Sequence, residues 1–184
     1  MRKRKLIVIA IAAFVLFSTV FFPYSIPSVY PAVPVKVGEM HQQKYNEDFA
    51  VFQSLFEERA MQPDYVVSYS ISLLNLYEMD WLTNTDYHMK RIEWEQLLTN
   101  IQSIKNELIR LSFRVEGLSE EAKMYLEQMI DSTMRIEETV AYHVNKKSTY
   151  SRKHISVTIR NLQNDIASSL SLYIHFNKTY QPTI

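Results

Sequence analysis

The sequence contains no cysteine and only two glycines among its 184 residues. Without cysteine the chain cannot form disulfide bonds, thiolate metal sites or a cysteine nucleophile. Two isolated glycines cannot supply the glycine-rich loop that cradles a phosphate group. The sequence therefore predicts neither a disulfide scaffold nor a phosphate-binding loop.

Recognisable catalytic and metal-binding motifs are also missing. None of the five histidines lies three or four residues from another, and neither E-x-x-H nor H-E-x-x-H occurs, so the sequence lacks paired helical metal ligands. No serine lies within G-x-S-x-G, the motif that frames a nucleophile in many hydrolases. We therefore expect no catalytic residue, no metal site and no cofactor, and we expect that the protein is not an enzyme.

The charges are balanced in total but unevenly distributed. Lysine and arginine together number 20, as do aspartate and glutamate, yet four basic residues lie within positions 2–5. Residues 6–184 consequently carry 16 basic and 20 acidic side chains, a formal charge of −4. Because nucleic-acid-binding proteins need a basic surface, this acidic body argues against nucleic acid as a partner.

An uncharged apolar run follows the basic residues and predicts a membrane anchor. Residues 6–22 read LIVIAIAAFVLFSTVFF, which as a helix would be about 25 Å long at 1.5 Å per residue. That length approaches the hydrocarbon thickness of a bilayer, ~30 Å. Basic residues before a span usually stay in the cytoplasm. We therefore expect residues 1–5 to be cytoplasmic, residues 6–22 to span the cell membrane once, and the rest to be extracytoplasmic.

A cleaved secretory signal is the alternative interpretation of the same run. The apolar core of such a signal usually has 7–15 residues, followed by small residues at the cleavage site. The run here is longer, and the best cleavage position, after Ser28, has the bulky Ile26 two residues before it. The sequence favours an uncleaved anchor, with a secreted, cleaved form as the alternative.

Four prolines, at positions 23, 27, 31 and 34, follow the apolar run. Proline fixes its own φ angle and disfavours a helix at the preceding residue. We therefore expect residues 23–37 to form an extended, semi-rigid spacer that lifts the body off the membrane.

The remaining residues, 38–184, show mostly helical periodicity. The expected helices cover approximately residues 39–61, 64–82, 86–115, 119–145 and 150–177. The range 64–82 is ambiguous, because Val67, Tyr69 and Ile71 alternate with serines as in a strand. A helix is favoured there because a lone strand would lack a partner. The predicted fold class is all-α: a single transmembrane helix and an up-and-down bundle of four or five helices.

The clearest periodicity is a heptad seam in the range 86–115. Its members follow one another at spacings of three and four residues: Trp94, Leu97, Ile101, Ile104, Leu108 and Leu111. Such a seam packs against another helix, either within the same chain or in a second one. It is therefore the candidate interaction surface for a partner or for self-association.

A basic stretch between the last two predicted helices is the second candidate site. It contains Lys146, Lys147, Arg152 and Lys153. These side chains could simply neutralise the partial negative charge at the end of a helix, or they could contact an anionic surface. If five helices alternate in direction, the turns at 83–86 and 145–150 both return to the membrane and the basic turn faces lipid headgroups. Without a separate helix at 64–82, the turn at 145–150 would lie at the end of the bundle away from the membrane, where it could face an anionic wall polymer.

Aromatic and methionine residues are frequent along the predicted helices. They include Tyr45, Phe49, Phe52, Phe56, Trp81, Trp94, Met124, Met129 and Met134. Helical spacing favours a core for these side chains, although an adaptable apolar groove is an alternative. We expect a membrane-anchored interaction or structural protein of the cell envelope, which binds a membrane or envelope protein or forms a homo-oligomer. The alternatives are a module that binds a lipid or apolar peptide, and an accessory sensor ectodomain.

Overall fold

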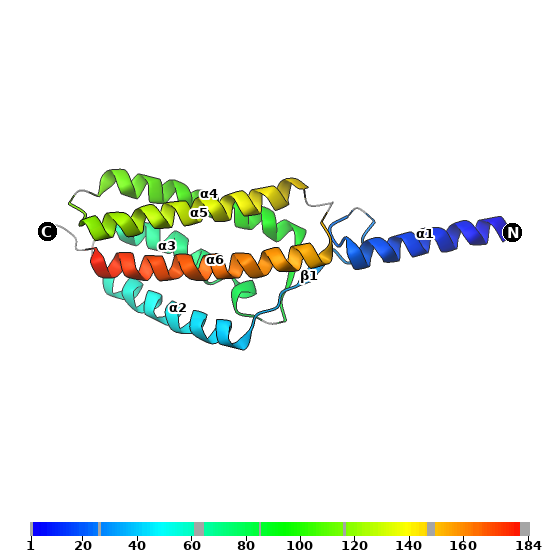
Figure 1. Ribbon diagram of the computed structural model, residues 1–184, viewed down its shortest axis with the longest axis horizontal. Helices are drawn as coiled ribbons and strands as arrows, with labels where there is room; N and C mark the ends of the chain where they lie inside the picture. Colours follow the sequence, from blue (N-terminus) through cyan, green and yellow to red (C-terminus); the bar gives the residue numbers. More distant parts are fainter. Residues whose placement is uncertain are drawn as a thin grey trace.

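The computed structural model describes residues 2–25, 27–60, 65–84, 86–115, 117–146 and 150–180. Within these ranges the chain is mainly helical, which confirms the all-α class, and it also contains two short strands. The first helix, α1 (Arg2–Phe21), projects away from the other helices along the long axis of the molecule (Figure 1). The other helices form a bundle, so the chain consists of a bundle with one protruding helix.

Among the described residues the bundle contains five α-helices, and they alternate in direction (Figure 1). They are α2 (Glu39–Ala60), α3 (Tyr65–Tyr77), α4 (Arg91–Arg114), α5 (Glu120–Lys146) and α6 (Arg152–Thr179). Helix α5 packs between α4 and α6, α3 packs on α4, and α2 packs on α6. This arrangement confirms the predicted up-and-down bundle and resolves the ambiguity at 64–82 in favour of a helix. A short 3-10 helix, Asp80–Leu82, follows α3.

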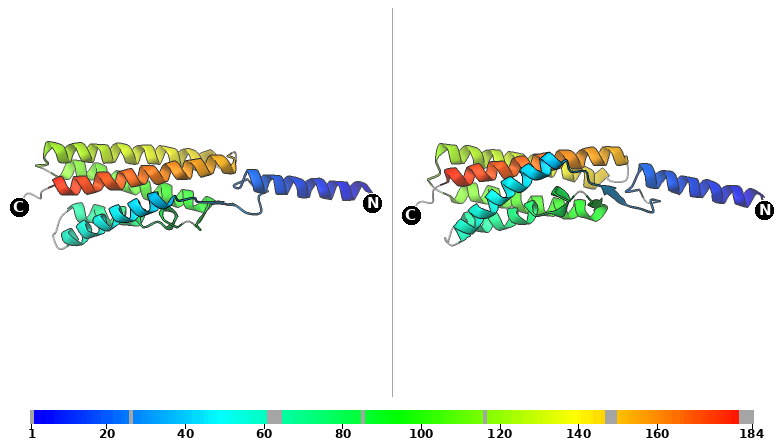
Figure 2. Two further views of the ribbon diagram at one scale, coloured as in Figure 1. Left: turned by 60° about the horizontal axis from the view of Figure 1, so that its bottom comes forward. Right: turned by 90° about the horizontal axis from the view of Figure 1, so that it is seen from below.

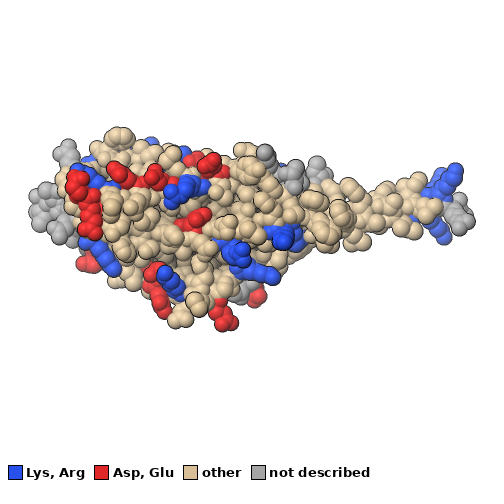
Figure 3. All heavy atoms as spheres, viewed as in Figure 1, with Lys and Arg blue, Asp and Glu red and all other residues tan. Residues whose placement is uncertain are grey.

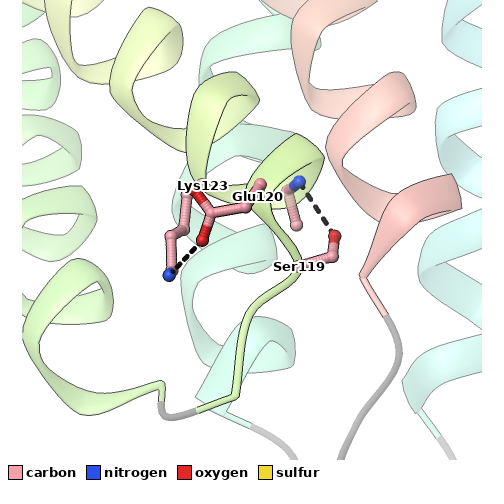
Figure 4. A network of polar contacts seen from close by, with 4 residues as sticks. Ser119, Glu120 and Lys123 are labelled. Atoms are coloured by element: carbon pink, nitrogen blue, oxygen red, sulfur yellow. Dashed lines mark hydrogen bonds and ion pairs between the residues drawn. The ribbon is translucent and has the colours of Figure 1, made fainter.

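The start of α5 shows how local sequence sets a helix boundary. Gly117 has a φ of 75°, a backbone conformation that glycine adopts without steric cost. Ser119 then caps α5, since its Oγ accepts a hydrogen bond of 3.1 Å from the backbone N–H of Ala122. Glu120 forms an ion pair of 2.8 Å with Lys123 one turn later (Figure 4). The Ser119 cap satisfies a backbone N–H at the start of α5 that has no partner within the helix.

The two strands were not predicted from the sequence. Strand β1 (Ala32–Pro34) pairs antiparallel with β2 (His88–Lys90), with Val33 opposite Met89. Val33 and Met89 are both fully buried. The helix predicted from residue 86 therefore begins only at Arg91, because the preceding residues pair with β1.

The segment after α1 first forms turns, in which the N–H groups of Ser25 and Ser28 donate to the carbonyls of Phe22 and Ser25. It is extended only near β1, so the extended spacer expected from the prolines forms in part and is packed onto the bundle. Tyr24, Ala32, Val33 and Val35 are each no more than 4% exposed. An extended backbone is also the conformation that pairs with a strand, and the side chains alternate between the two faces. The residues predicted to act as a spacer are thus part of the hydrophobic core, and the bundle lies directly against the end of α1 (Figure 2).

The heptad seam of α4 is part of the same core. All six of its residues are no more than 3% exposed: Trp94, Leu97, Ile101, Ile104, Leu108 and Leu111. Because α4 packs against α5 and α3 of the same chain, the seam faces internal helices. It leaves no surface in this structure for a second molecule, which differs from the interaction surface that the sequence suggested.

Candidate functional site

Helix α1 exposes apolar side chains along its length. Its stretch Lys3–Phe21 has a mean hydropathy of 2.1 and only 6% of it is buried against the rest of the chain. The exposed side chains include Leu6, Ile9, Phe14 and Leu16, each at least 61% exposed. In Figure 3 no charged residue is visible between the basic tip of α1 and the bundle. This helix is long and apolar enough to cross a membrane, and a signal sequence would have the same composition.

Arg152 connects the end of α1 to the bundle. It is the first residue of α6, and its guanidinium donates hydrogen bonds to the carbonyl oxygens of Thr19 (2.9 Å), Val20 (3.1 Å) and Ala32 (2.8 Å). The last carbonyls of a helix lack partners within the helix and carry a partial negative charge. Thr19 in particular cannot bond to the residue four positions later, because Pro23 has no N–H. Arg152 supplies the missing donors from a distant part of the chain.

Tyr24 forms a second connection at the same place. Its side chain is 4% exposed, its hydroxyl donates to the carbonyl of Met89 at 2.8 Å, and it accepts from the indole N–H of Trp94 at 3.1 Å. Burial raises the pKa of this phenol above its usual value, so it stays neutral and able to donate. Tyr24 thus fixes the segment after α1 to β2 and α4.

His143 lies at the centre of an aromatic cluster beside this junction. Its ring stacks on Trp94 at a centroid distance of 5.1 Å, on His154 at 5.5 Å, and lies 4.7 Å from the ring of Tyr150. Tyr142 meets the ring of His143 edge-on at 5.7 Å. These five side chains, which we call the His143 cluster, join α4, α5 and α6 at the end of the bundle nearest α1.

Both ring nitrogens of His143 have polar partners. Nδ1 lies 2.9 Å from the carbonyl oxygen of Thr139, and Nε2 lies 3.0 Å from the hydroxyl of Thr158. A carbonyl can only accept, so in the neutral ring Nδ1 carries the hydrogen, and Nε2 accepts the single hydroxyl hydrogen of Thr158, for which the carbonyl oxygen of His154 at 3.2 Å competes. Burial lowers the pKa of His143 below its ordinary value of 6.5, and the nearby His154 lowers it further. The site therefore favours a neutral His143.

This shift predicts that the bundle loses stability in mild acid. At a pH between the lowered pKa of His143 in the native protein and the ordinary value of 6.5, the unfolded chain binds more protons than the native one. The free energy of unfolding is therefore highest above this pH range and decreases as the pH falls through it. We expect the free energy of unfolding to be lower at pH 5 than at pH 7. Denaturant titrations of the full chain in micelles would measure it.

Two variants identify the group responsible for the pH dependence. His143→Gln is expected to flatten the pH profile, whereas His175→Gln, at an exposed position of α6, is expected to leave it unchanged. An identical profile in wild type and His143→Gln would contradict the assignment.

The cavity next to the His143 cluster is too small for an organic ligand. It has a volume of about 10 Å³ and is lined by Tyr24, Arg91, Trp94, His143, Tyr150 and Ile155. Such a volume holds about one water molecule. The junction is therefore packed as a structural connection.

A larger, open groove with both polar and apolar lining lies between α2 and α6. Its volume is about 440 Å³, and its polar lining residues are His41, Lys44, Asp48, Asn164, Ser168 and Ser171. The Nε2 atom of His41 is buried and has no hydrogen-bond partner in the structure. A buried polar atom without a partner costs free energy until a donor or acceptor reaches it. The exposed side chains of Lys44, Asn164 and Ser168 offer polar contacts to another molecule in this groove.

The basic stretch predicted as an anionic contact is divided by the structure. Arg152 is occupied by the carbonyls at the end of α1, whereas Lys153 is exposed on α6. Lys146 is the last residue of α5, and its side chain and the whole of Lys147 lie outside the described residues. The last residues of α5 and the first residues of α6 lie at the α1 end of the bundle (Figure 1), as expected for five helices that alternate in direction.

Most of the aromatic and methionine residues considered for an apolar groove lie in the core. Tyr45, Phe52, Trp81, Trp94 and Met129 are buried. Phe49 and Phe56 are partly buried, and Met124 and Met134 are exposed on α5. The sequence did not indicate the contacts of Tyr24 or His143, because their partners are distant in the chain.

The structure also gives no basis for a metal centre in its described part. Among these residues no group of three or more histidine, cysteine, aspartate or glutamate side chains is placed to hold a metal ion. Comparison with protein-family models, with curated protein sequences and with solved structures finds no match to this chain.

Proposed function

We propose that the chain is a single-pass membrane protein of the cell envelope that holds a helical bundle outside the cytoplasm, where the bundle binds a protein partner. The exposed apolar surface of α1 carries this proposal, since only 6% of its apolar stretch is covered by the chain itself. Transfer of such a surface from water into lipid is strongly favourable. The basic residues at its tip favour a cytoplasmic N-terminus.

The contacts at the end of α1 support an uncleaved anchor. Cleavage after Ser28 would remove Thr19 and Val20, which provide two of the three carbonyls bound by Arg152. It would also remove Tyr24, whose hydroxyl connects Met89 and Trp94. A signal peptide that is discarded has no reason to contribute buried polar contacts to the mature fold, and their loss would leave those groups without partners.

The groove between α2 and α6 is the surface that we propose for the partner. It is open, six of its lining residues are polar, and one of them is His41, whose Nε2 has no partner in the structure. Self-association through the seam of α4 is no longer part of the proposal, since those side chains lie inside the bundle.

Crosslinking in carbonate-washed native membranes tests the anchor and the partner together. We expect the chain to remain in the washed membranes at the mass of its uncleaved sequence. A photoreactive residue at Ser168, in the groove, is expected to capture one defined protein, whereas the same residue at Glu127, exposed on α5, is expected to capture none.

The possible failures are distinguishable. A soluble product trimmed near Ser28 would contradict the anchor. Full-length protein in the membrane with equal labelling from both positions, or with none, would contradict the partner site.

A further inference from the structure

We infer that the end of the bundle nearest α1 lies on the bilayer itself, in contact with anionic phospholipid headgroups around the emerging helix. The inference rests on the proposed membrane anchor. It goes beyond that proposal in two ways. Residues 29–30 and the start of α6 are assigned as the parts of the chain that contact lipid, and the bundle is placed in direct contact with the membrane.

The length of α1 sets the level of the membrane surface. After its four basic residues, α1 continues as the apolar stretch of residues 6–21, whose 16 residues are about 24 Å long and just short of the ~30 Å thickness of the hydrocarbon layer. When α1 spans this layer from its basic tip, its last turn, which contains Thr19 and Val20, reaches the boundary with the headgroups. Backbone carbonyls at that boundary need donors, because the hydrocarbon offers none.

Arg152 places the bundle at the same level. Its guanidinium lies 2.9 Å from the carbonyl oxygen of Thr19 and 3.1 Å from that of Val20. The first turn of α6 is therefore at the depth of the headgroups, where a permanently charged guanidinium is favoured near phosphates. Figure 2 shows the same close approach of α6 and the end of α1 in both views.

The side chains around this junction suit an interface between lipid and water. Val29 is 76% exposed and Tyr30 51% exposed, although both lie in the segment that otherwise packs on the bundle. Tyrosine is enriched at the headgroup level of membranes. Exposed apolar side chains are costly in water but not in this region.

Exposed cations surround the same end. Lys90, Arg91 and Lys153 are exposed, and they lie in or next to β2 and at the start of α6. Of the acids nearby, Glu93 accepts hydrogen bonds from the Tyr87 hydroxyl and from the backbone N–H of Lys90, and Asp86 is exposed. Asp80 is also exposed and lies close enough to act on Tyr87. The three exposed cations Lys90, Arg91 and Lys153 thus outnumber these two exposed acids, and anionic headgroups are the complementary surface.

Spin labels on single cysteines measure the depth of this end directly. The chain has no cysteine, so each variant carries one label: Val29→Cys and Lys153→Cys at the junction, Leu16→Cys within α1, and Phe113→Cys as the matched control. Phe113 is 83% exposed and lies near the end of α4 that is far from α1 (Figure 1). The full-length protein is reconstituted in phosphatidylcholine vesicles with about one third phosphatidylglycerol. Accessibility to a water-soluble nickel chelate is then compared with accessibility to oxygen.

The expected result is several-fold lower accessibility to nickel at positions 29 and 153 than at 113, with position 16 open to oxygen only. Removing phosphatidylglycerol is expected to increase nickel accessibility at 153.

If the label at position 16 lies in lipid but the labels at positions 29 and 153 are as accessible to nickel as the label at position 113, this inference is wrong and the proposed anchor stands. If 16 is open to nickel, the anchor itself is wrong. Protection of 29 and 153 in native membranes but not in the vesicles would mean that a protein covers this end, and no effect of phosphatidylglycerol would exclude anionic lipid as its partner.

Discussion

Replacing Leu108 with alanine is expected to lower the free energy of unfolding by about 2–5 kcal/mol, the range observed for large-to-small changes in protein cores. Leu108 has no exposed surface and lies in the middle of the α4 seam, where α4 packs on other helices of the bundle. The loss combines the transfer free energy of the deleted carbons with the cavity that remains. Denaturant titration of the full chain in micelles, followed by circular dichroism, measures the change.

Phe113→Ala in the same helix is the matched control. Phe113 is 83% exposed, so we expect a change within about 0.5 kcal/mol. The comparison also tests the alternative role of the seam as an interface between molecules. If Leu108→Ala weakened association and left the free energy of unfolding unchanged, the packing described for α4 would be incorrect.

Arg152→Ala is expected to separate α1 from the bundle. The variant loses three hydrogen bonds from a charged donor and leaves carbonyls at the end of α1 unsatisfied. Because the site is only partly buried, we expect a loss of about 2 kcal/mol in the free energy of unfolding. We also expect faster proteolysis between α1 and β1, which limited digestion of the reconstituted protein would detect by mass spectrometry.

Two neighbouring variants control for charge and position. Lys153→Ala removes the adjacent cation, which is exposed, and is expected to change neither stability nor digestion. Arg152→Lys keeps the charge but has a single ammonium in place of the planar fork, so we expect an intermediate loss. Equal effects of Arg152→Ala and Lys153→Ala would show that net charge matters and that the contacts to the carbonyls do not.

The features that the sequence predicts correctly are those with a local signal. The seam from Trp94 to Leu111 repeats every three or four residues and defines the buried side of α4. Gly117 and Ser119 mark the boundary before α5 within three positions. Such patterns arise because helical geometry relates neighbours that are close in sequence.

The junction could not be predicted because its contacts join distant positions. Arg152 binds carbonyls more than a hundred residues earlier in the chain, and β1 and β2 are only three residues long. Prolines before and within β1 indicated an extended backbone but not the strand with which it pairs. The sequence therefore predicted the extended conformation only for the part of this segment near β1, missed the turns before it and its packing on the bundle, and identified Arg152 only as a surface cation.

The direct attachment of α1 to α6 has a mechanical consequence. Helix α6 has 28 residues, so it extends about 42 Å from the attachment point. Membrane helices adopt a range of tilts, and a change of about 10° within that range would swing the distal tip sideways by about 7 Å. Thickening or thinning of the bilayer, or a neighbouring span that leans on α1, would in this way be converted into lateral displacement of the outermost turns.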